Sequence, residues 1–121
     1  MRPPFPPAGG AAVDFSAVLL DLDGTITDSA PAIVASFSAT FADLGIAVPD
    51  HATLMGFVGP PLADTFAHYA GLTGPEGARA AALYRSHYRE LMHRAPVYEG
   101  MPELVRSLHD AGVPLALATS K

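Results

Sequence analysis

The sequence contains no cysteine, which excludes a disulfide framework, a thiolate zinc site and thiol-based catalysis. Basic residues are scarce, since 7 Lys and Arg face 12 Asp and Glu, for a net charge of −5. This balance argues against nucleic-acid binding, which requires a basic surface. Long apolar stretches are also missing, because the longest uncharged segments fall well short of the ~20 residues of a membrane span. We therefore expect a cytoplasmic protein whose partners include neither a nucleic acid nor a membrane.

Apolar residues make up 50% of the 121 residues, and charged residues make up 16%. This composition is typical of a globular protein and not of a disordered chain. The length corresponds to one modest domain, or to one small domain that carries an insertion. Residues 1–13 are rich in proline, glycine and alanine, so we expect a flexible leader there. The same residues contain too much proline and glycine for the core of a signal peptide.

Two short apolar runs predict the strands of a parallel sheet. They occupy residues 17–20 and 113–118, and continuous apolarity over so few residues indicates strands that are covered on both faces. A crossover between parallel strands is right-handed by default and places the strands side by side. Polar residues follow each run, at 21–25 and at 119–121. Because open α/β sheets bind ligands at the carboxyl ends of their strands, these two segments form the candidate site.

The sequence between the two runs has the pattern of a helical bundle. Apolar residues recur at about one helical turn, with proline or capping residues before each group and glycine after it. We expect the phenylalanine and tyrosine side chains to form the core of this bundle. A further helix is predicted directly before the second strand. The predicted helices lie at about 30–44, 50–57, 62–70, 74–93 and 102–111.

Asp21 and Asp23 place two carboxylates at the end of the first predicted strand, where Gly24 permits a sharp turn. Two acidic groups so close together do not both stay charged without a cation or a shared proton. Oxygen ligands of this kind suit Mg²⁺, so both residues are candidate metal ligands. A carboxylate is also a nucleophile toward phosphorus, and its neighbour can serve as acid and base. The plainer interpretation is an acidic turn that ends a strand and caps the next helix.

The residues around these carboxylates resemble the first motif of the haloacid dehalogenase-like hydrolase superfamily. Residues 18–29, VLLDLDGTITDS, match every fixed position of the pattern hhhDxDGTxxDS, in which h is apolar. Residues 115–119 are similar to the second motif, an apolar strand that ends in threonine or serine. The resemblance covers residues 14–121. Similarity to the phosphoglycolate phosphatase branch lies in GPPL at 59–62, DTF at 64–66, Tyr84 and Tyr88.

This resemblance implies an α/β fold with a Rossmann-like core, of which two parallel strands are present, and an inserted helical cap. The core would comprise residues 14–29 and 96–121, and the cap would comprise residues 30–95. Two later motifs of the superfamily, a lysine and an acidic pair that completes the metal site, are not found in these residues. Lys121 directly follows the second motif, so we do not assign it the role of that lysine.

The resemblance also implies a mechanism. Asp21 would attack the phosphoryl group to form an aspartyl-phosphate, and Asp23 would protonate the leaving alcohol and then activate the hydrolytic water. A Mg²⁺ ion would contact Asp21 and the backbone carbonyl of Asp23. The phosphate oxygens would be held by residues that follow the two strands, namely Gly24, Thr25, Thr119 and Ser120.

The implied substrate is a small phosphorylated metabolite. Phosphoglycolate is the leading candidate, from the resemblance of the cap, and nucleotides or sugar phosphates are alternatives. We expect these residues to be the N-terminal portion of a longer enzyme, inactive alone and able to self-associate through an exposed sheet edge. Two interpretations from other classes stay open. They are a phosphoacceptor signalling domain, whose acceptor aspartate has no counterpart between residues 30 and 110, and a non-catalytic fragment that binds a partner.

Overall fold

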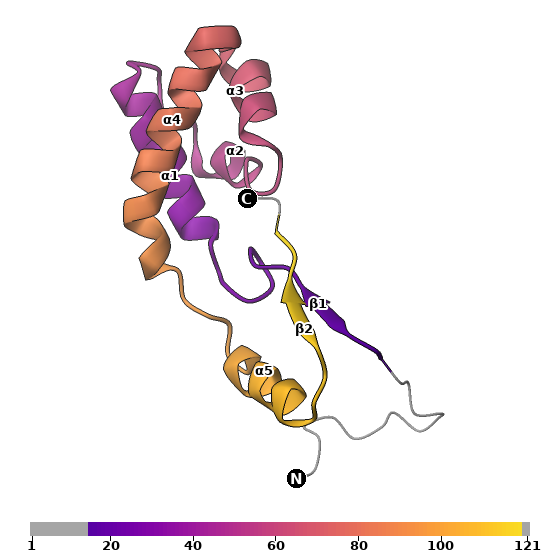
Figure 1. The fold of residues 1–121 in the computed structure, drawn as a ribbon. Helices are drawn as coiled ribbons and strands as arrows, with labels where there is room; N and C mark the ends of the chain where they lie inside the picture. The colour runs from indigo at the N-terminus through magenta and orange to yellow at the C-terminus, as the bar shows by residue number, and fades with distance from the viewer. Residues whose placement is uncertain (1–14, 120–121) are drawn as a thin grey trace. The chain divides into compact units, whose positions relative to one another are not determined.

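The computed structural model describes residues 15–119, which form two compact units (Figure 1). The first unit combines residues 15–28 with residues 96–119, and the second unit is Ser29–Ala95. The predicted leader, residues 1–13, lies outside the described residues. No helix among residues 15–119 is long and apolar enough to cross a membrane.

The first unit contains a two-stranded parallel sheet. Strand β1 (Val18–Leu20) pairs with strand β2 (Leu115–Leu117), and the register places Leu20 opposite Leu117. Helix α5 (Met101–Asp110) directly precedes β2. The predicted α/β class and the parallel orientation of the two strands are therefore confirmed, although both strands are shorter than the apolar runs that predicted them.

Within the described residues the sheet is not covered on both faces, although its continuous apolar runs suit strands that are. Leu19 is 71% exposed and Leu117 is 54% exposed, whereas Val18 and Leu20 are half-buried. Successive side chains of a strand point to opposite faces, so Leu19 lies on the face opposite Val18 and Leu20. One face of β1 is thus partly covered and the other face is open to solvent.

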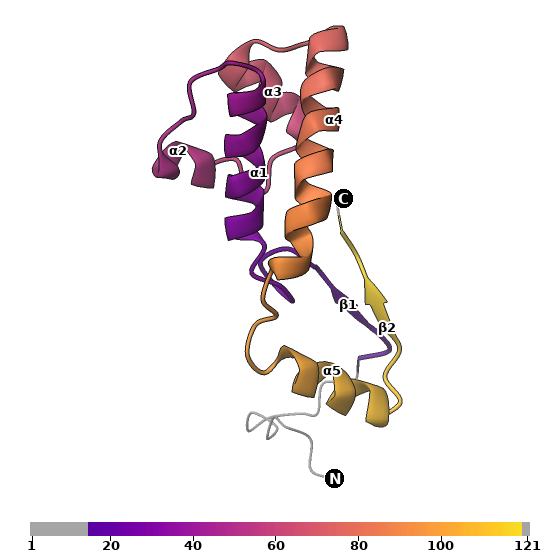
Figure 2. The same ribbon diagram turned by 90° about the vertical axis from the view of Figure 1, so that its left-hand side faces the viewer.

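The second unit is a helical bundle, and its four predicted helices are confirmed with small differences at their ends. The elements are α1 (Ala30–Asp43), α2 (His51–Met55), α3 (Leu62–Ala70), α4 (Gly74–Leu91) and η1 (Met92–Arg94). Helices α1 and α4 lie side by side in both views (Figures 1 and 2), with α3 packed against α4 and α2 against α1. The single-turn helix η1 follows α4 without a break, so the long helix predicted to end near residue 93 tightens in its last turn.

Helix α1 ends at the glycine that the sequence indicated. Gly45 has φ +69°, a left-handed conformation that side chains with a Cβ rarely adopt. Its amide donates to the Ala42 carbonyl at 3.1 Å, and the Ile46 amide donates to the Phe41 carbonyl at 2.9 Å. These two hydrogen bonds form a Schellman motif, which satisfies carbonyls that the end of the helix would otherwise leave unpaired.

The helix starts differ in how they are capped. Ser29 is at the N-cap of α1, as expected, but its side chain makes no capping hydrogen bond and is buried. Asp50 does cap α2, because its Oδ1 accepts a hydrogen bond from the Thr53 amide at 2.8 Å. The hydrogen bonds from the backbone and side chain of Thr53 lower the pKa of Asp50 below its ordinary value.

Aromatic rings form the core of the bundle, as predicted. The Phe37 side chain is 1% exposed, and its ring centroid lies 4.6 Å from that of Tyr84, 5.1 Å from Phe57 and 5.5 Å from Phe66. Such tilted aromatic contacts add to the hydrophobic stabilisation that burial provides. Phe37 is therefore the side chain on which the packing of α1 against the other helices centres.

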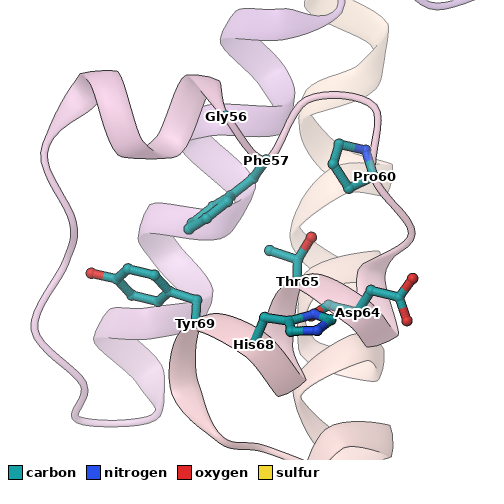
Figure 3. Close-up of a pocket in the computed structure, with 7 residues that line it drawn as sticks. All are labelled: Gly56, Phe57, Pro60, Asp64, Thr65, His68 and Tyr69. Atoms are coloured by element: carbon teal, nitrogen blue, oxygen red, sulfur yellow. The ribbon is translucent and has the colours of Figure 1, made fainter.

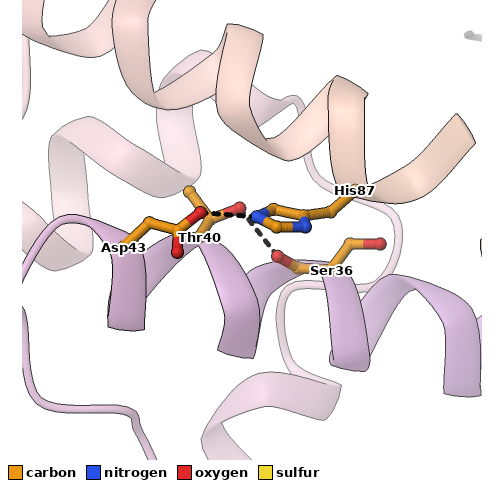
Figure 4. A network of polar contacts seen from close by, with 4 residues as sticks. All are labelled: Ser36, Thr40, Asp43 and His87. Carbon is orange, nitrogen blue, oxygen red and sulfur yellow. Dashed lines mark hydrogen bonds and ion pairs between the residues drawn. The ribbon is translucent and has the colours of Figure 1, made fainter. Parts of the chain in front are cut away.

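Polar side chains between α1 and α4 are paired within the bundle (Figure 4). The buried Thr40 hydroxyl donates to the Ser36 carbonyl at 2.7 Å, so it is not left without a partner. Near the end of α1, Nε2 of His87 lies 2.7 Å from Oδ2 of Asp43. Because Asp43 is 48% exposed, this contact contributes little to stability in comparison with the aromatic core.

Replacing Phe37 with alanine tests this account of the core. We expect Phe37→Ala to lower the free energy of unfolding by about 3–5 kcal/mol, because it removes a buried ring and leaves a cavity. Urea denaturation followed by far-UV circular dichroism measures the change. The matched control is Phe15→Ala, since Phe15 is 70% exposed and its loss should cost less than about 0.5 kcal/mol. Equal losses for both variants would contradict the central position of Phe37.

Candidate active site

The parallel register brings the two predicted site segments to the same edge of the sheet. The Ala118 amide donates to the Leu20 carbonyl at 2.8 Å, which extends the pairing of β1 and β2 by one step. Asp21 follows Leu20 directly and Thr119 follows Ala118, so both residues emerge at the carboxyl ends of neighbouring strands. Ser120 lies outside the described residues. This edge is where the sequence predicted the site.

The loop after β1 folds tightly around one carbonyl group. The Leu22 carbonyl accepts hydrogen bonds from the Ile26 and Thr27 amides, each at 3.0 Å, and from the Thr25 amide at 3.4 Å. Gly24 has φ +75°, and no atom lies within 4 Å of the place where a Cβ would be. Glycine is therefore needed here for its conformation and not for lack of space. Its amide donates to the Thr27 carbonyl at 2.9 Å, which closes the loop.

Thr27 joins this loop to a distant part of the chain. Its backbone pairs with Asp23 on one side and, in antiparallel orientation, with Val97 on the other. On either side of this second pairing, the Asp28 amide donates to the Pro96 carbonyl at 2.8 Å, and the Tyr98 amide donates to the Ile26 carbonyl at 2.9 Å. The segment 96–98 thus supports the loop that carries both aspartates. Sequence reasoning missed this support, because pairing between backbone groups leaves no motif in the side chains.

The two carboxylates differ in their surroundings. Asp21 is exposed, and its Oδ1 accepts a hydrogen bond from the Leu22 amide at 2.9 Å, which limits how its side chain can rotate. Asp23 is half-buried in the closed loop. Thr25 and Thr119 are exposed. The Asp21 carboxylate is therefore open to solvent, and the Asp23 carboxylate is partly so. The exposed hydroxyls are those of Thr25 in the loop and Thr119 after β2.

The oxygen atoms of this loop are of the type that binds a magnesium ion. Among residues 15–119, no group of three or more His, Asp or Glu side chains is close enough to hold a metal ion. Mg²⁺ does not need such a group, because it retains several waters and binds through one or two carboxylates together with substrate phosphate. Asp21 and Asp23 supply hard oxygen donors of that type.

Comparison with known proteins identifies a family for this arrangement. The family model described as haloacid dehalogenase-like hydrolase matches residues 18–121. A 5'-nucleotidase of Pseudomonas aeruginosa is 38% identical over 112 residues, covering 92% of this chain and 51% of that protein. The plasmid-encoded phosphoglycolate phosphatase of Cupriavidus necator is 35% identical over 111 residues, covering 88% of this chain and 48% of that protein.

Solved structures of other proteins have a similar fold. The crystal structure of a predicted phosphatase from Clostridium acetobutylicum is similar with a TM-score of 0.79 at 39% identity, covering 88% of this chain and 50% of that one. The structure of protein tyrosine kinase A of Mycobacterium tuberculosis is similar with a TM-score of 0.71 at 35% identity. The match covers 85% of this chain and 48% of that one. The chain thus spans about half the length of the relatives it matches. It belongs to the haloacid dehalogenase-like hydrolase family, as its first motif indicated.

Proposed function

We propose that the protein that contains this chain is a phosphomonoester hydrolase that works through an aspartyl-phosphate on Asp21. The observation that carries the proposal is the placement of Asp21 and Asp23 in a hydrogen-bonded loop at the carboxyl end of β1, with Thr119 at the end of the adjacent strand. Relatives named as phosphatases and as a nucleotidase support the same class of reaction.

The proposed reaction has two steps. The Asp21 carboxylate attacks phosphorus, a new oxygen–phosphorus bond forms, and the bond to the substrate alcohol breaks while Asp23 gives that alcohol a proton. Asp23 then takes a proton from a water molecule, which attacks the same phosphorus and releases inorganic phosphate and the free Asp21 carboxylate. The hydrogen bond from the Leu22 amide to Oδ1 leaves Oδ2 of Asp21 to act as the nucleophile.

The proposal divides the phosphate-binding residues by what their groups can do. The Gly24 amide already donates to the Thr27 carbonyl, so we assign Gly24 a conformational role and not a phosphate contact. The hydroxyls of Thr25 and Thr119 would donate to phosphate oxygens, together with Ser120. Asp21 and the Asp23 carbonyl would hold Mg²⁺, which when bound neutralises charge on the phosphate oxygens.

The substrate class is a small phosphorylated metabolite, and phosphoglycolate is the candidate we favour. The bundle Ser29–Ala95 would act as the cap that admits this substrate and excludes water. The relative named as phosphoglycolate phosphatase supports this candidate. A nucleotide is the second candidate, because a relative named as 5'-nucleotidase shares 38% identity with the chain.

Substitution of the two aspartates tests the mechanism in the protein with its complete hydrolase core. We expect Asp21→Asn to reduce phosphate release to background, because an amide cannot form the acyl-phosphate. Asp23→Asn should slow release by about 10²–10⁴, the usual contribution of a general acid and base. Asp110→Asn on α5 is the control and should keep full activity. Turnover of Asp21→Asn within about tenfold of the parent protein would contradict the assignment.

We further propose that residues 1–121 alone lack phosphatase activity and self-associate. Among the described residues, β1 pairs only with β2, so its other edge offers backbone groups to another strand beside the exposed Leu19. Static light scattering of the parent chain should show a mass above that of a monomer. In Leu19→Lys the mass should fall toward that of a monomer. The control is Met92→Lys, which places a lysine at an exposed apolar residue in the other unit. A monomeric parent chain, or equal effects of both variants, would contradict association through β1.

A further inference from the structure

The second unit carries a surface pocket of its own, lined by residues of that unit alone. It has a volume of about 330 Å³, near the lower limit of roughly 300 Å³ for small-molecule sites. It lies between the end of α2 and the exposed side of α3 (Figure 3). The residues that line it are Gly56, Phe57, Pro60, Asp64, Thr65, His68 and Tyr69.

One end of the pocket is aromatic and the other end is acidic. The rings of Phe57 and Tyr69 meet edge to face, with centroids 5.2 Å apart, and lie at one end in Figure 3. Asp64 lies at the opposite end, and the His68 ring is between them. Neither a lysine nor an arginine lines the pocket, and Asp64 is the one carboxylate among its lining residues.

Two polar side chains beside Asp64, those of Thr65 and His68, make hydrogen bonds to the backbone of α3 or of the residue before it. Nδ1 of His68 lies 2.8 Å from the Asp64 carbonyl, and since a carbonyl only accepts, Nδ1 must carry a hydrogen. In the neutral tautomer that carries its hydrogen on Nδ1, Nε2 of His68 is an acceptor. The Thr65 hydroxyl donates to the Pro61 carbonyl at 3.2 Å, so only its acceptor capacity is left. Together with the Asp64 carboxylate, these acceptor groups favour a ligand that brings its own hydrogen-bond donors.

We infer that this pocket binds a flat organic cation, an amidinium or a guanidinium attached to an apolar group. The cation would donate to Asp64 and to Nε2 of His68, and its flat apolar part would lie against Phe57 and Tyr69. Planar cations of this kind combine fork-shaped donors with stacking on aromatic faces. A phosphate ester would find neither a positive charge nor a hydrogen-bond donor on Asp64, Thr65 or neutral His68. The pocket is thus distinct in chemistry from the Asp21 loop, and the inference does not rest on the proposed hydrolase activity.

Benzamidine is a suitable probe, because it joins an amidinium to an aromatic ring. Saturation-transfer NMR on the 121-residue chain measures its dissociation constant whatever the size of the assembly. We expect millimolar binding of benzamidine at neutral pH, and at least about fivefold weaker binding of benzamide, which is neutral and of the same shape. Benzoate, the corresponding anion, should bind no better than benzamide. Equal binding of benzamidine and benzamide, or no binding of benzamidine, would overturn the inference.

Two variants with matched controls locate the site. Asp64→Asn and Tyr69→Leu should each weaken benzamidine binding by about fivefold, since they remove the charge and one aromatic wall. Asp110→Asn and Tyr98→Leu change the same residue types in the other unit, where Tyr98 is 40% exposed and Tyr69 is 44% exposed. These controls should leave binding unchanged. Binding that survives both pocket variants, or that falls equally in the controls, would show that the cation binds elsewhere and would overturn the assignment.

Discussion

The candidate site depends on the parallel pairing of β1 with β2. This pairing joins residues near the two ends of the described chain and sets Leu20 opposite Leu117. Parallel strands need a long crossover, and here the crossover contains the whole helical bundle and α5. Because the two strands are parallel, Asp21 and Thr119 leave the sheet at the same edge. A slip of one residue would also turn Leu19 toward the partly covered face and expose Val18 and Leu20.

A second set of backbone hydrogen bonds fixes the conformation of the loop after β1, which carries Asp21 and Asp23. The Leu22 carbonyl accepts hydrogen bonds from three amides, and the backbone of Thr27 pairs with Val97. These contacts lie where the chain passes into the second unit, after Asp28, and where it returns, at Pro96. The conformation of the loop that carries both aspartates is therefore set by backbone hydrogen bonds, and φ +75° favours glycine at Gly24.

The sequence was most informative where side chains carry the signal. Apolar periodicity and the stop at Gly45 predicted the bundle and its aromatic core, and the DxDGT motif predicted the family. Leu19 is exposed among the described residues, because apolar composition reports what a strand can bury and not what is there to bury it. The support by residues 96–98 and the hydrogen bond of the Gly24 amide could not be predicted, since both involve backbone groups. The pocket beside His68 likewise depends on which hydrogen bonds form within α3.

The central claim is that Asp21 becomes phosphorylated, and chemical trapping tests it most directly. The protein with its complete hydrolase core is mixed with substrate, quenched in acid within the first turnover, and treated with borohydride, which reduces an aspartyl-phosphate to homoserine. Mass spectrometry of the peptide that contains residues 18–29 then locates the change. The account predicts homoserine at Asp21, with Asp23 intact. Homoserine at Asp23, or active turnover that leaves both aspartates unmodified under single-turnover conditions, would contradict it.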